Sequence, residues 1–340
     1  MEEFEIPVVL FIFKRQHTLK RIIERIATVK PKKMYIIADG PRNEEESEKV
    51  KKCRETVEKS INWKCEVIKN YATKNRGVFE NIAGGARWVF EREKFAIFLE
   101  DDNLPEITFF EYCRELLYKY ENNKQILWIC GTNYLQEYET KDNASYVFTR
   151  HLMPCGWASW KDKFNKFYDG QLKVLEEKEN EKKIKKMYEN KKLYEQQINL
   201  AKMEKSRLNR GLKPLSWDHQ MAISIRANDL YGISPKYNQI ENIGVDNDSI
   251  HGGTNFDNVM TKRFCTIKTK ELEMPLKHPK KIEVDKKYEK EVGNIILYPL
   301  KSRVKIRIAN RVKKILGLNY EDSIKKYLNE RRGKNAKNHR

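Results

Sequence analysis

Short apolar runs separated by helical patterns occupy the first third of the chain. A continuous apolar run is typical of a strand buried on both faces of a sheet, and the amphipathic stretches between the runs indicate covering helices. The β-α-β-α order therefore predicts an α/β fold with a mostly parallel central sheet flanked by helices. The expected strands cover residues 6–13, 33–38, 63–68, 95–99, 125–131 and 145–149, the expected helices residues 18–29, 44–60, 78–93 and 217–228, and an irregular loop residues 234–258.

Polar clusters follow three of these strands at the point where each strand ends. They are Lys14-Arg15, Asp39-Gly40 and Glu100-Asp101-Asp102. Open parallel sheets bind their ligands at the carboxyl ends of the strands. Because the three clusters converge on that edge, the sequence predicts a binding site there.

The run Glu100-Asp101-Asp102 is the most informative of the three clusters. Three adjacent carboxylates repel one another unless a cation neutralises them. Hard oxygen ligands suit Mn²⁺ or Mg²⁺, and such ions usually also bind the phosphates of a substrate. The alternative is that the acids cap a helix that begins near Pro105.

Several stretches together resemble the GT-A glycosyltransferases, in particular the animal N-acetylglucosaminyltransferase I type. The strongest is the metal-binding region, 96–102, which ends in Glu-Asp-Asp and is followed by Phe-Phe-Glu-Tyr at 109–112. The similarity covers roughly residues 5–255, and the charged segment 171–213 lies outside it. The other matching stretches, in order, are Ile6-Pro7-Val8, Arg15, Asp39-Gly40, Arg87-Trp88, Gly156-Trp157, Trp217-Asp218 and Ser249-Ile250-His251-Gly252.

This resemblance implies a GT-A fold and transfer of a sugar from a UDP-sugar, with inversion at the anomeric carbon and with Mn²⁺ or Mg²⁺ as cofactor. It makes Asp102 the direct metal ligand, assigns Asp101 to the ribose, and gives Glu100 a supporting role. The metal would offset charge on the leaving diphosphate.

Four further roles are carried over from the same resemblance. Asp39 would accept a hydrogen bond from the uracil N3–H, and Arg15 would lie beside the base or the phosphate. Asp218 would be the general base that deprotonates the acceptor hydroxyl, and His251 would approach the diphosphate. The family has two acids after the tryptophan, whereas here His219 follows Asp218, so His219 is a competing candidate for the base.

Aromatic and glycine residues leave two interpretations open. Trp157 and Trp217 are candidates for the acceptor side, since a flat indole suits the C–H face of a sugar, but Trp157 could equally be a core residue. The turn Asn75-Arg76-Gly77 could let the backbone approach the donor, or it could be an ordinary turn before a helix.

The expected organisation is one catalytic domain, 1–300, with a nucleotide-sugar half up to about residue 131 and an acceptor-side half from 132. The latter contains a charged helical insertion, 171–213, expected to project from the body. A basic tail, 301–340, carries 14 Lys and Arg against three acidic residues, a net charge of +11 out of +19. A basic amphipathic helix at 304–316 would lie on a membrane surface or dock on the domain, and a disordered end would follow Arg331.

Compartment and partners follow from the remaining features. The six cysteines form no metal-ligand pattern, and neither a signal peptide nor a membrane anchor is apparent. The sequence therefore predicts a cytoplasmic protein with buried free thiols, peripheral on the inner face of the cell membrane if the tail binds there. The animal enzymes carry an N-terminal membrane anchor, so the chain looks more like a bacterial relative, and the resemblance implies as partners a UDP-sugar and a glycan or lipid-linked acceptor used in surface polysaccharide synthesis.

Two other classes of function compete with this one. A nucleotidyltransferase can share the same nucleotide site, but it usually has a glycine-rich loop after the first strand, and 13–17 contains no glycine. A nucleic-acid-binding protein would suit the charge of +19, yet it would need aromatic residues among the basic ones. Only Tyr320 and Tyr327 meet that need in the tail, so no nucleic acid is expected as a partner.

Overall fold

The computed structural model of the chain describes residues 4–245 and 256–337. His251 and the rest of Ser249-Ile250-His251-Gly252 lie outside the described residues, so the role predicted for His251 stays a prediction. The strands are β1 (Val8–Ile12), β2 (Lys33–Ala38), β3 (Glu66–Tyr71), β4 (Phe95–Glu100), β5 (Asn103–Pro105), β6 (Ile126–Cys130), β7 (Tyr146–Thr149), β8 (Trp157–Trp160), β9 (Tyr231–Pro235) and β10 (Ile240–Asn242).

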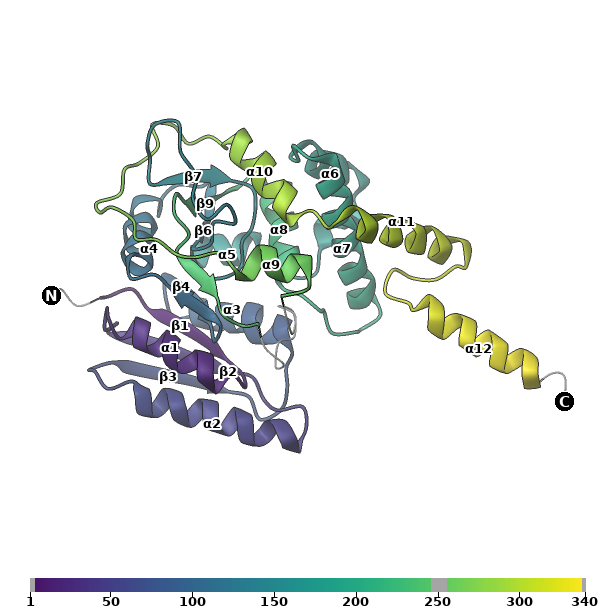
Figure 1. Cartoon of the computed structure of the whole chain (residues 1–340), viewed down its shortest axis with the longest axis horizontal. Coiled ribbons are helices and arrows are strands. Elements are labelled where there is room, and N and C mark those ends of the chain that lie inside the picture. Colours follow the sequence, from purple (N-terminus) through teal and green to yellow (C-terminus); the bar gives the residue numbers. More distant parts are fainter. Residues whose placement is uncertain (1–3, 246–255, 338–340) are drawn as a thin grey trace.

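Helices cover both faces of the central sheet, which contains all of these strands except β5 and β10 (Figure 1). A π-helical turn, Phe79–Gly84, leads into α3, and a 3₁₀ turn, Lys173–Glu176, precedes α6. The α-helices are α1 (Gln16–Ile26), α2 (Glu44–Ser60), α3 (Gly85–Phe90), α4 (Thr108–Lys119), α5 (Lys161–Phe167), α6 (Lys178–Lys186), α7 (Lys191–Asn209), α8 (Asp218–Ala227), α9 (Val259–Cys265), α10 (Lys286–Ile296), α11 (Leu300–Ile315) and α12 (Ile324–Lys337).

The central sheet has eight strands in the order β3-β2-β1-β4-β8-β6-β9-β7. Strands β3, β2, β1 and β4 are parallel, and β6 is parallel to β9. Strand β8 runs antiparallel between β4 and β6, and β7 is an antiparallel edge strand. The predicted fold class, an α/β fold with a mostly parallel central sheet flanked by helices and followed by a basic helical tail, is confirmed.

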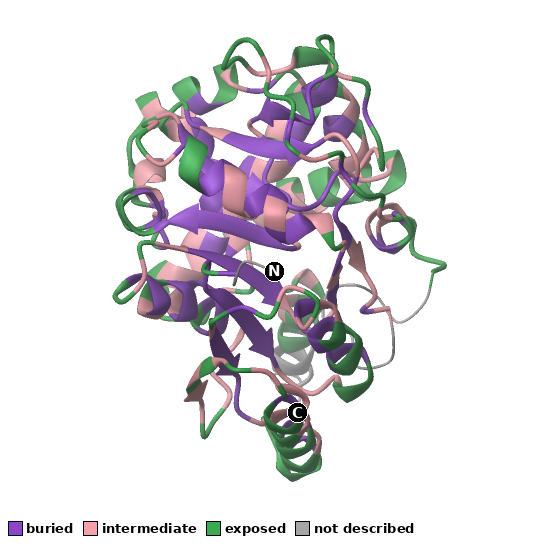
Figure 2. Cartoon of the chain, turned by 90° about the vertical axis from the view of Figure 1, so that its left-hand side faces the viewer, coloured by how far each residue is buried: buried purple, intermediate pink, exposed green. Residues whose placement is uncertain are grey.

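The alternation of side chains along β1 divides the core into two layers. Val8 and Leu10 point into the layer under α1, α2 and α4, whereas Val9 and Phe11 point into the layer under α3, α5, α8 and α10. Successive residues of a strand face opposite sides, so a run that is apolar at every position can feed both layers. Figure 2 shows the result, with buried strands inside and exposed helix surfaces outside.

The charged insertion at 171–213 packs on the body, contrary to the prediction that it projects. Its helices α6 and α7 contribute Ile184, Leu193, Ile198 and Ala201 to a third apolar cluster, which Ile223 of α8 completes. Each helix has too few apolar residues to show a clear stripe by itself. Together with α8, the two helices bury them.

Three other expectations on local structure need correction. The segment 234–258, expected as a loop, contains the end of β9 and all of β10, which pairs with β5. Strand β3 begins at Glu66 rather than at residue 63, because this edge strand is only partly buried and its pattern is weak. Helix α12 runs to Lys337, through the segment expected to be disordered.

The tail leaves the body as two successive helices. Helices α11 and α12 extend away from the sheet, at the right of Figure 1. None of the described helices is long and apolar enough to cross a bilayer. All six cysteines are free thiols, four of them buried, while Cys65 and Cys155 are partly exposed.

Candidate active site

A cavity of about 460 Å³ opens at the carboxyl ends of β1, β2 and β4. It lies where an α/β sheet is expected to bind its ligand. The side chains that the sequence singles out come to this cavity from positions as far apart as residues 15 and 218. Those that line it are Arg15, Asp39, Glu100, Asp101, Asp102 and Asp218.

Asp101 connects the ends of two neighbouring strands. Its Oδ2 accepts a hydrogen bond from the amide of Phe13 at 2.8 Å, and its Oδ1 lies 3.6 Å from the Arg15 guanidinium. Strands β1 and β4 pair in parallel with Phe11 opposite Glu100, so both chains leave the sheet at the same level. The acid run is thereby held against the segment that carries Arg15.

Asp102 is enclosed by partners from three parts of the chain. Arg15 Nη1 lies 2.6 Å from its Oδ2, and Asn103 Nδ2 donates to its Oδ1 at 2.7 Å. Gly244, just after β10, lies so close that an added Cβ would come within 2.8 Å of Asp102 Cβ. Gly244 is a site residue that sequence reasoning missed, since it is one of several glycines in a segment expected to be a loop.

Burial and repulsion affect the protonation of Glu100. Burial raises the pKa of its carboxyl well above the usual value, and the neighbouring charges of Asp102 and Asp101 raise it further. Arg15 opposes this rise. Glu100 is therefore hard to ionise beside its neighbours, and a cation bound at the cluster would favour its charged form.

The residues of the cluster fit a metal ion that takes some of its ligands from the protein and the others from a bound substrate. In the part of the chain that the structure describes, no group of three His, Cys, Asp or Glu side chains is placed to hold a metal by itself. Mg²⁺ and similar ions are commonly held by one or two carboxylates plus substrate phosphates. Asp102 faces the cavity and offers hard oxygen atoms of this kind.

Asp39 holds a loop, which differs from the role that the resemblance assigns to it. Its Oδ1 accepts from the amides of Gly40 at 2.8 Å and Arg76 at 2.7 Å, and its Oδ2 from Asn75 Nδ2 at 2.9 Å and Gly77 N at 3.1 Å. A carboxylate has about four acceptor positions. All four are used within the chain, so a uracil N3–H would have to displace one of these donors.

The turn at 75–77 forms part of the cavity wall. Gly77 lines the cavity and has a φ of +84°, a conformation that favours glycine. Lys213, from the loop before α8, donates from its Nζ to the carbonyl of Asn75 at 3.2 Å. That loop also supplies Pro214 and Leu215 to the lining. The turn and the loop are therefore in contact with each other, and both line the cavity.

Lys14 and Arg42 add positive charge to the wall. Both line the cavity and both pair with Glu46 in the first turn of α2, Lys14 at 3.2 Å. Hydrogen bonds from Arg42 lower the pKa of Glu46 to about 2. Sequence reasoning missed Arg42, although its position just past the end of β2 is a usable signal. These cations suit a negatively charged ligand.

Asp218 is the first residue of α8 and faces the cavity. Its Oδ1 accepts a hydrogen bond from the hydroxyl of Ser216. His219, the competing candidate, is not among the described residues that line the cavity, and its Nδ1 is buried without a hydrogen-bond partner. The geometry therefore favours Asp218 over His219 for a reaction in this cavity.

Trp157 and Trp217 belong to the core, so neither offers a face to an acceptor sugar. The Trp157 ring is stacked between Phe98 and Trp128, with ring centroids 3.9 and 4.1 Å away, and is 1% exposed. Trp217 is 4% exposed and packs at 5.6 Å from Trp157. The interpretation of these residues as acceptor-side contacts is corrected accordingly.

No protein-family model matches the chain, and no curated protein matches it in sequence. Solved structures that it resembles include the mannosyltransferase PcManGT from Pyrobaculum calidifontis in complex with GDP-Man and Mn²⁺, at 11% identity and a TM-score of 0.34, over 48% of this chain and 46% of that one. They also include residues 1–349 of TarS from S. aureus, at 12% identity and a TM-score of 0.34, over 48% and 50%.

A third solved structure is UDP-glucose pyrophosphorylase complexed with UDP-glucose, at 10% identity and a TM-score of 0.34, over 71% of this chain and 94% of that one. The chain spans about half the length of the first two structures.

Proposed function

We propose that the protein is an inverting, metal-dependent glycosyltransferase that uses a UDP-sugar. The observation that carries the proposal is the meeting of two kinds of group in one cavity. A carboxylate cluster with flanking cations, Asp101 and Asp102 beside Arg15, lies at the strand ends, and a separate carboxylate, Asp218, faces the same space. The first kind suits a metal and a diphosphate, and the second suits an acceptor hydroxyl.

The donor would be bound through charge. Asp102 would hold Mn²⁺ or Mg²⁺, which when bound stabilises the negative charge of a diphosphate, and Asp101 would hold the ribose. Arg15 already lies 2.6 Å from Asp102 and can turn toward phosphate oxygens, while Lys14 and Arg42 extend the positive wall. Asn75 and Gly77, which Asp39 holds by hydrogen bonds, line the cavity on the side of β2.

Asp218 would receive the proton of the acceptor hydroxyl. A sugar hydroxyl is a poor nucleophile, and a carboxylate within hydrogen-bond reach makes its attack easier. Ser216 donates to Oδ1 of Asp218, which orients the carboxylate and leaves Oδ2 for the acceptor. Direct attack on the anomeric carbon inverts its configuration, so an α-linked donor would give a β-linked product.

The acceptor that we propose is a glycan, free or attached to a lipid, in the synthesis of a bacterial surface polysaccharide. The protein would act in the cytoplasm, peripheral to the inner face of the cell membrane. The loop 213–215, which lines the cavity beside Asp218, is where the acceptor would approach.

Calorimetry with UDP in the presence and absence of Mn²⁺ tests the metal-dependent donor site. Wild-type protein should bind UDP more tightly with Mn²⁺, and its melting temperature should rise by mass action. Asp102→Asn should abolish the effect of Mn²⁺ and lower turnover by about 10³-fold or more, since the metal contributes several kcal/mol. Asp162→Asn, an exposed acid at the start of α5, is the matched control.

Two results would contradict the proposal. Unchanged UDP affinity of Asp102→Asn in Mn²⁺ would remove Asp102 from the metal site. Formation of a nucleotide sugar and pyrophosphate from UTP and a sugar 1-phosphate, followed by ³¹P NMR, would make the protein a nucleotidyltransferase instead.

A further inference from the structure

Helix α11 presents a line of apolar side chains to solvent. Leu300, Val304, Ile308 and Ile315 are 66%, 45%, 56% and 83% exposed. Spacings of four, four and seven residues place them on one side of an α-helix. None of the described residues of α11 is buried. Single exposed apolar residues are common, but an aligned set on one helix indicates an interaction surface. We call these four residues the outer stripe.

Positive charge surrounds the outer stripe. Between Leu300 and Ile315 there are seven Lys and Arg and no acidic residue. Lys301 and Lys305 border the stripe directly, since they form one shallow surface depression with Leu300, Val304 and Ile308. Lysine can bury its methylene chain beside apolar groups and keep its ammonium group in a polar layer.

Helix α11 is attached to the body through side chains outside the outer stripe. Arg307 pairs with Glu195 of α7 at 2.7 Å, and Arg303 Nε donates to the carbonyl of Tyr298 at 2.9 Å. Ile306 and Lys313 face a groove of about 750 Å³ between α7 and α11. The outer stripe does not line this groove, so it is directed away from the body and is free to meet a surface.

A second attachment connects the tail to the loop at the cavity. Arg210, at the end of α7, pairs with Glu321 at 2.7 Å and Asp322 at 2.8 Å in the connection between α11 and α12. The same stretch of chain continues to Lys213, which donates a hydrogen bond to the carbonyl of Asn75, and to Leu215, which lines the cavity. Arg210 thus joins the connection after α11 to the end of α7, three residues before Lys213.

We propose that α11 binds the surface of an anionic phospholipid membrane, lying in the plane of the interface with its outer stripe among the acyl chains. An apolar stripe bordered by lysine, with no acidic residue, is complementary to a layer of phosphate headgroups over hydrocarbon. A nucleic acid would leave the stripe in water. The proposal extends the proposed function, from which it takes only the cytoplasmic setting, and it stands on residues outside the cavity.

Sedimentation with lipid vesicles tests the membrane surface. The full-length protein should bind vesicles of phosphatidylcholine mixed with phosphatidylglycerol, bind pure phosphatidylcholine far less, and release with rising salt. The triple variant Leu300→Gln/Val304→Gln/Ile308→Gln should bind at least about tenfold more weakly, because it removes three apolar anchors. Lys301→Gln/Lys305→Gln should also lose at least about tenfold.

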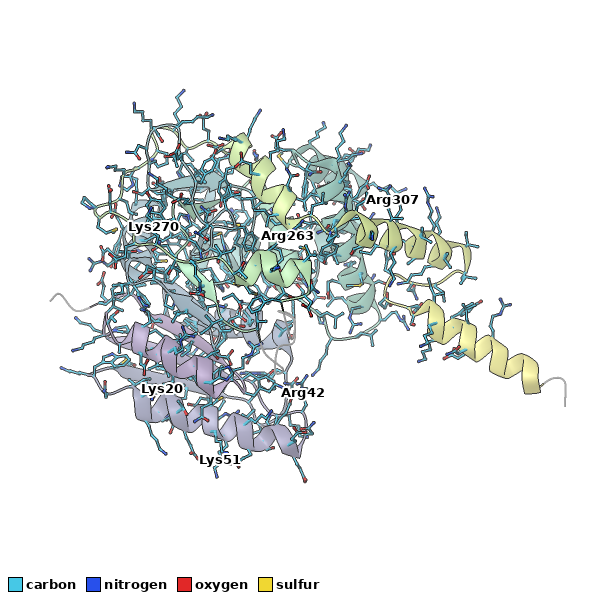
Figure 3. All side chains as sticks on the ribbon, in the orientation of Figure 1. Lys20, Arg42, Lys51, Arg263, Lys270 and Arg307 are labelled. Carbon is cyan, nitrogen blue, oxygen red and sulfur yellow. The ribbon has the colours of Figure 1, made fainter. Side chains whose placement is uncertain are left out.

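Matched controls use the opposite side of the molecule. Lys51→Gln/Lys52→Gln, on exposed positions of α2, and Ile107→Gln, an exposed apolar residue, should bind vesicles like the wild type. Figure 3 labels Lys51 on α2, at the base of the view, and Arg307 on α11 at the right. Because the altered residues are exposed, all variants should keep the wild-type melting temperature and UDP affinity.

The possible outcomes distinguish membrane binding by α11 from binding to a nucleic acid or to a second copy of the chain. They also distinguish it from the proposed transfer reaction. Wild-type levels of vesicle binding in the triple variant, or equal losses in the α2 control, would overturn it. Tighter binding to duplex DNA than to anionic vesicles would identify a nucleic acid as the partner. A dimer in light scattering that the triple variant makes monomeric would identify a second copy. Failure of UDP binding would overturn the proposed function and leave the vesicle result standing.

Discussion

Asp39 illustrates how one carboxylate at a strand end can serve the protein rather than a ligand. Its two oxygens accept four hydrogen bonds, three of them from the turn at 75–77 and one from Gly40. The neighbouring Arg54 stabilises the same corner by donating to the carbonyls of Asp39 and Ala72. The turn that forms part of the cavity wall therefore depends on Asp39 for its conformation.

Replacing Asp39 with Asn should lower stability more than it changes nucleotide binding. An amide NH₂ would face N–H donors that now point at an oxygen, and unpaired buried donors cost about 1–3 kcal/mol. We expect the free energy of unfolding in urea to fall by about 2 kcal/mol. The Asp162→Asn control should stay at the wild-type value. A variant of normal stability that has lost UDP affinity would instead support direct contact between Asp39 and the base.

Asp218 should act in the reaction and not in donor binding. Asp218→Asn should retain UDP affinity in Mn²⁺ and lose turnover by about 10²- to 10⁴-fold, the usual contribution of a general base. His219→Ala should lose much less, because His219 does not line the cavity. Anomeric couplings of the product, measured by NMR, should report a β-linkage from an α-linked donor. An α-linked product would require another role for Asp218.

At the scale of elements, a stack of aromatic rings joins the central sheet to α8. The rings of Phe11, Phe98, Trp157 and Trp128 lie nearly parallel in succession, and Trp217 tilts against the last two. They come from β1, β4, β8 and β6, and from the residue that precedes α8. The stack thus fixes where α8 begins, and with it the position of Asp218.

Removing the centre of this stack should destabilise the protein. Trp157→Ala should lower the free energy of unfolding by about 3–5 kcal/mol, as expected for a fully buried aromatic residue. Trp88→Ala, at a partly exposed position in α3, is the control and should cost less. Unfolding should be followed by circular dichroism, since the tryptophans themselves change. A stable Trp157→Ala protein with weakened acceptor binding would restore the sugar-contact interpretation.

For the whole molecule, the elements with strong local patterns could be predicted and the short ones could not. Strands β1, β2 and β4 and helices α1 and α2 were expected close to their observed bounds, because long apolar runs and amphipathic periods are local signals. Strands β5 and β10 have three residues each, too few to show a period. Their pairing depends on contacts between residues more than 130 positions apart.

The sequence alone determined the fold class and the edge of the sheet at which the cavity lies. Runs of apolar residues require burial on both faces, parallel strands end at a common edge, and the acids of 100–102 follow such a strand. Only the tertiary structure decided what each polar group at that edge touches. Whether a carboxylate meets Arg15, a backbone amide or open cavity depends on segments distant in the chain. That is why the hydrogen bonds of Asp39 to the turn at 75–77, the core position of Trp157, and the places of Gly244 and Arg42 at the cavity were found only in the folded protein.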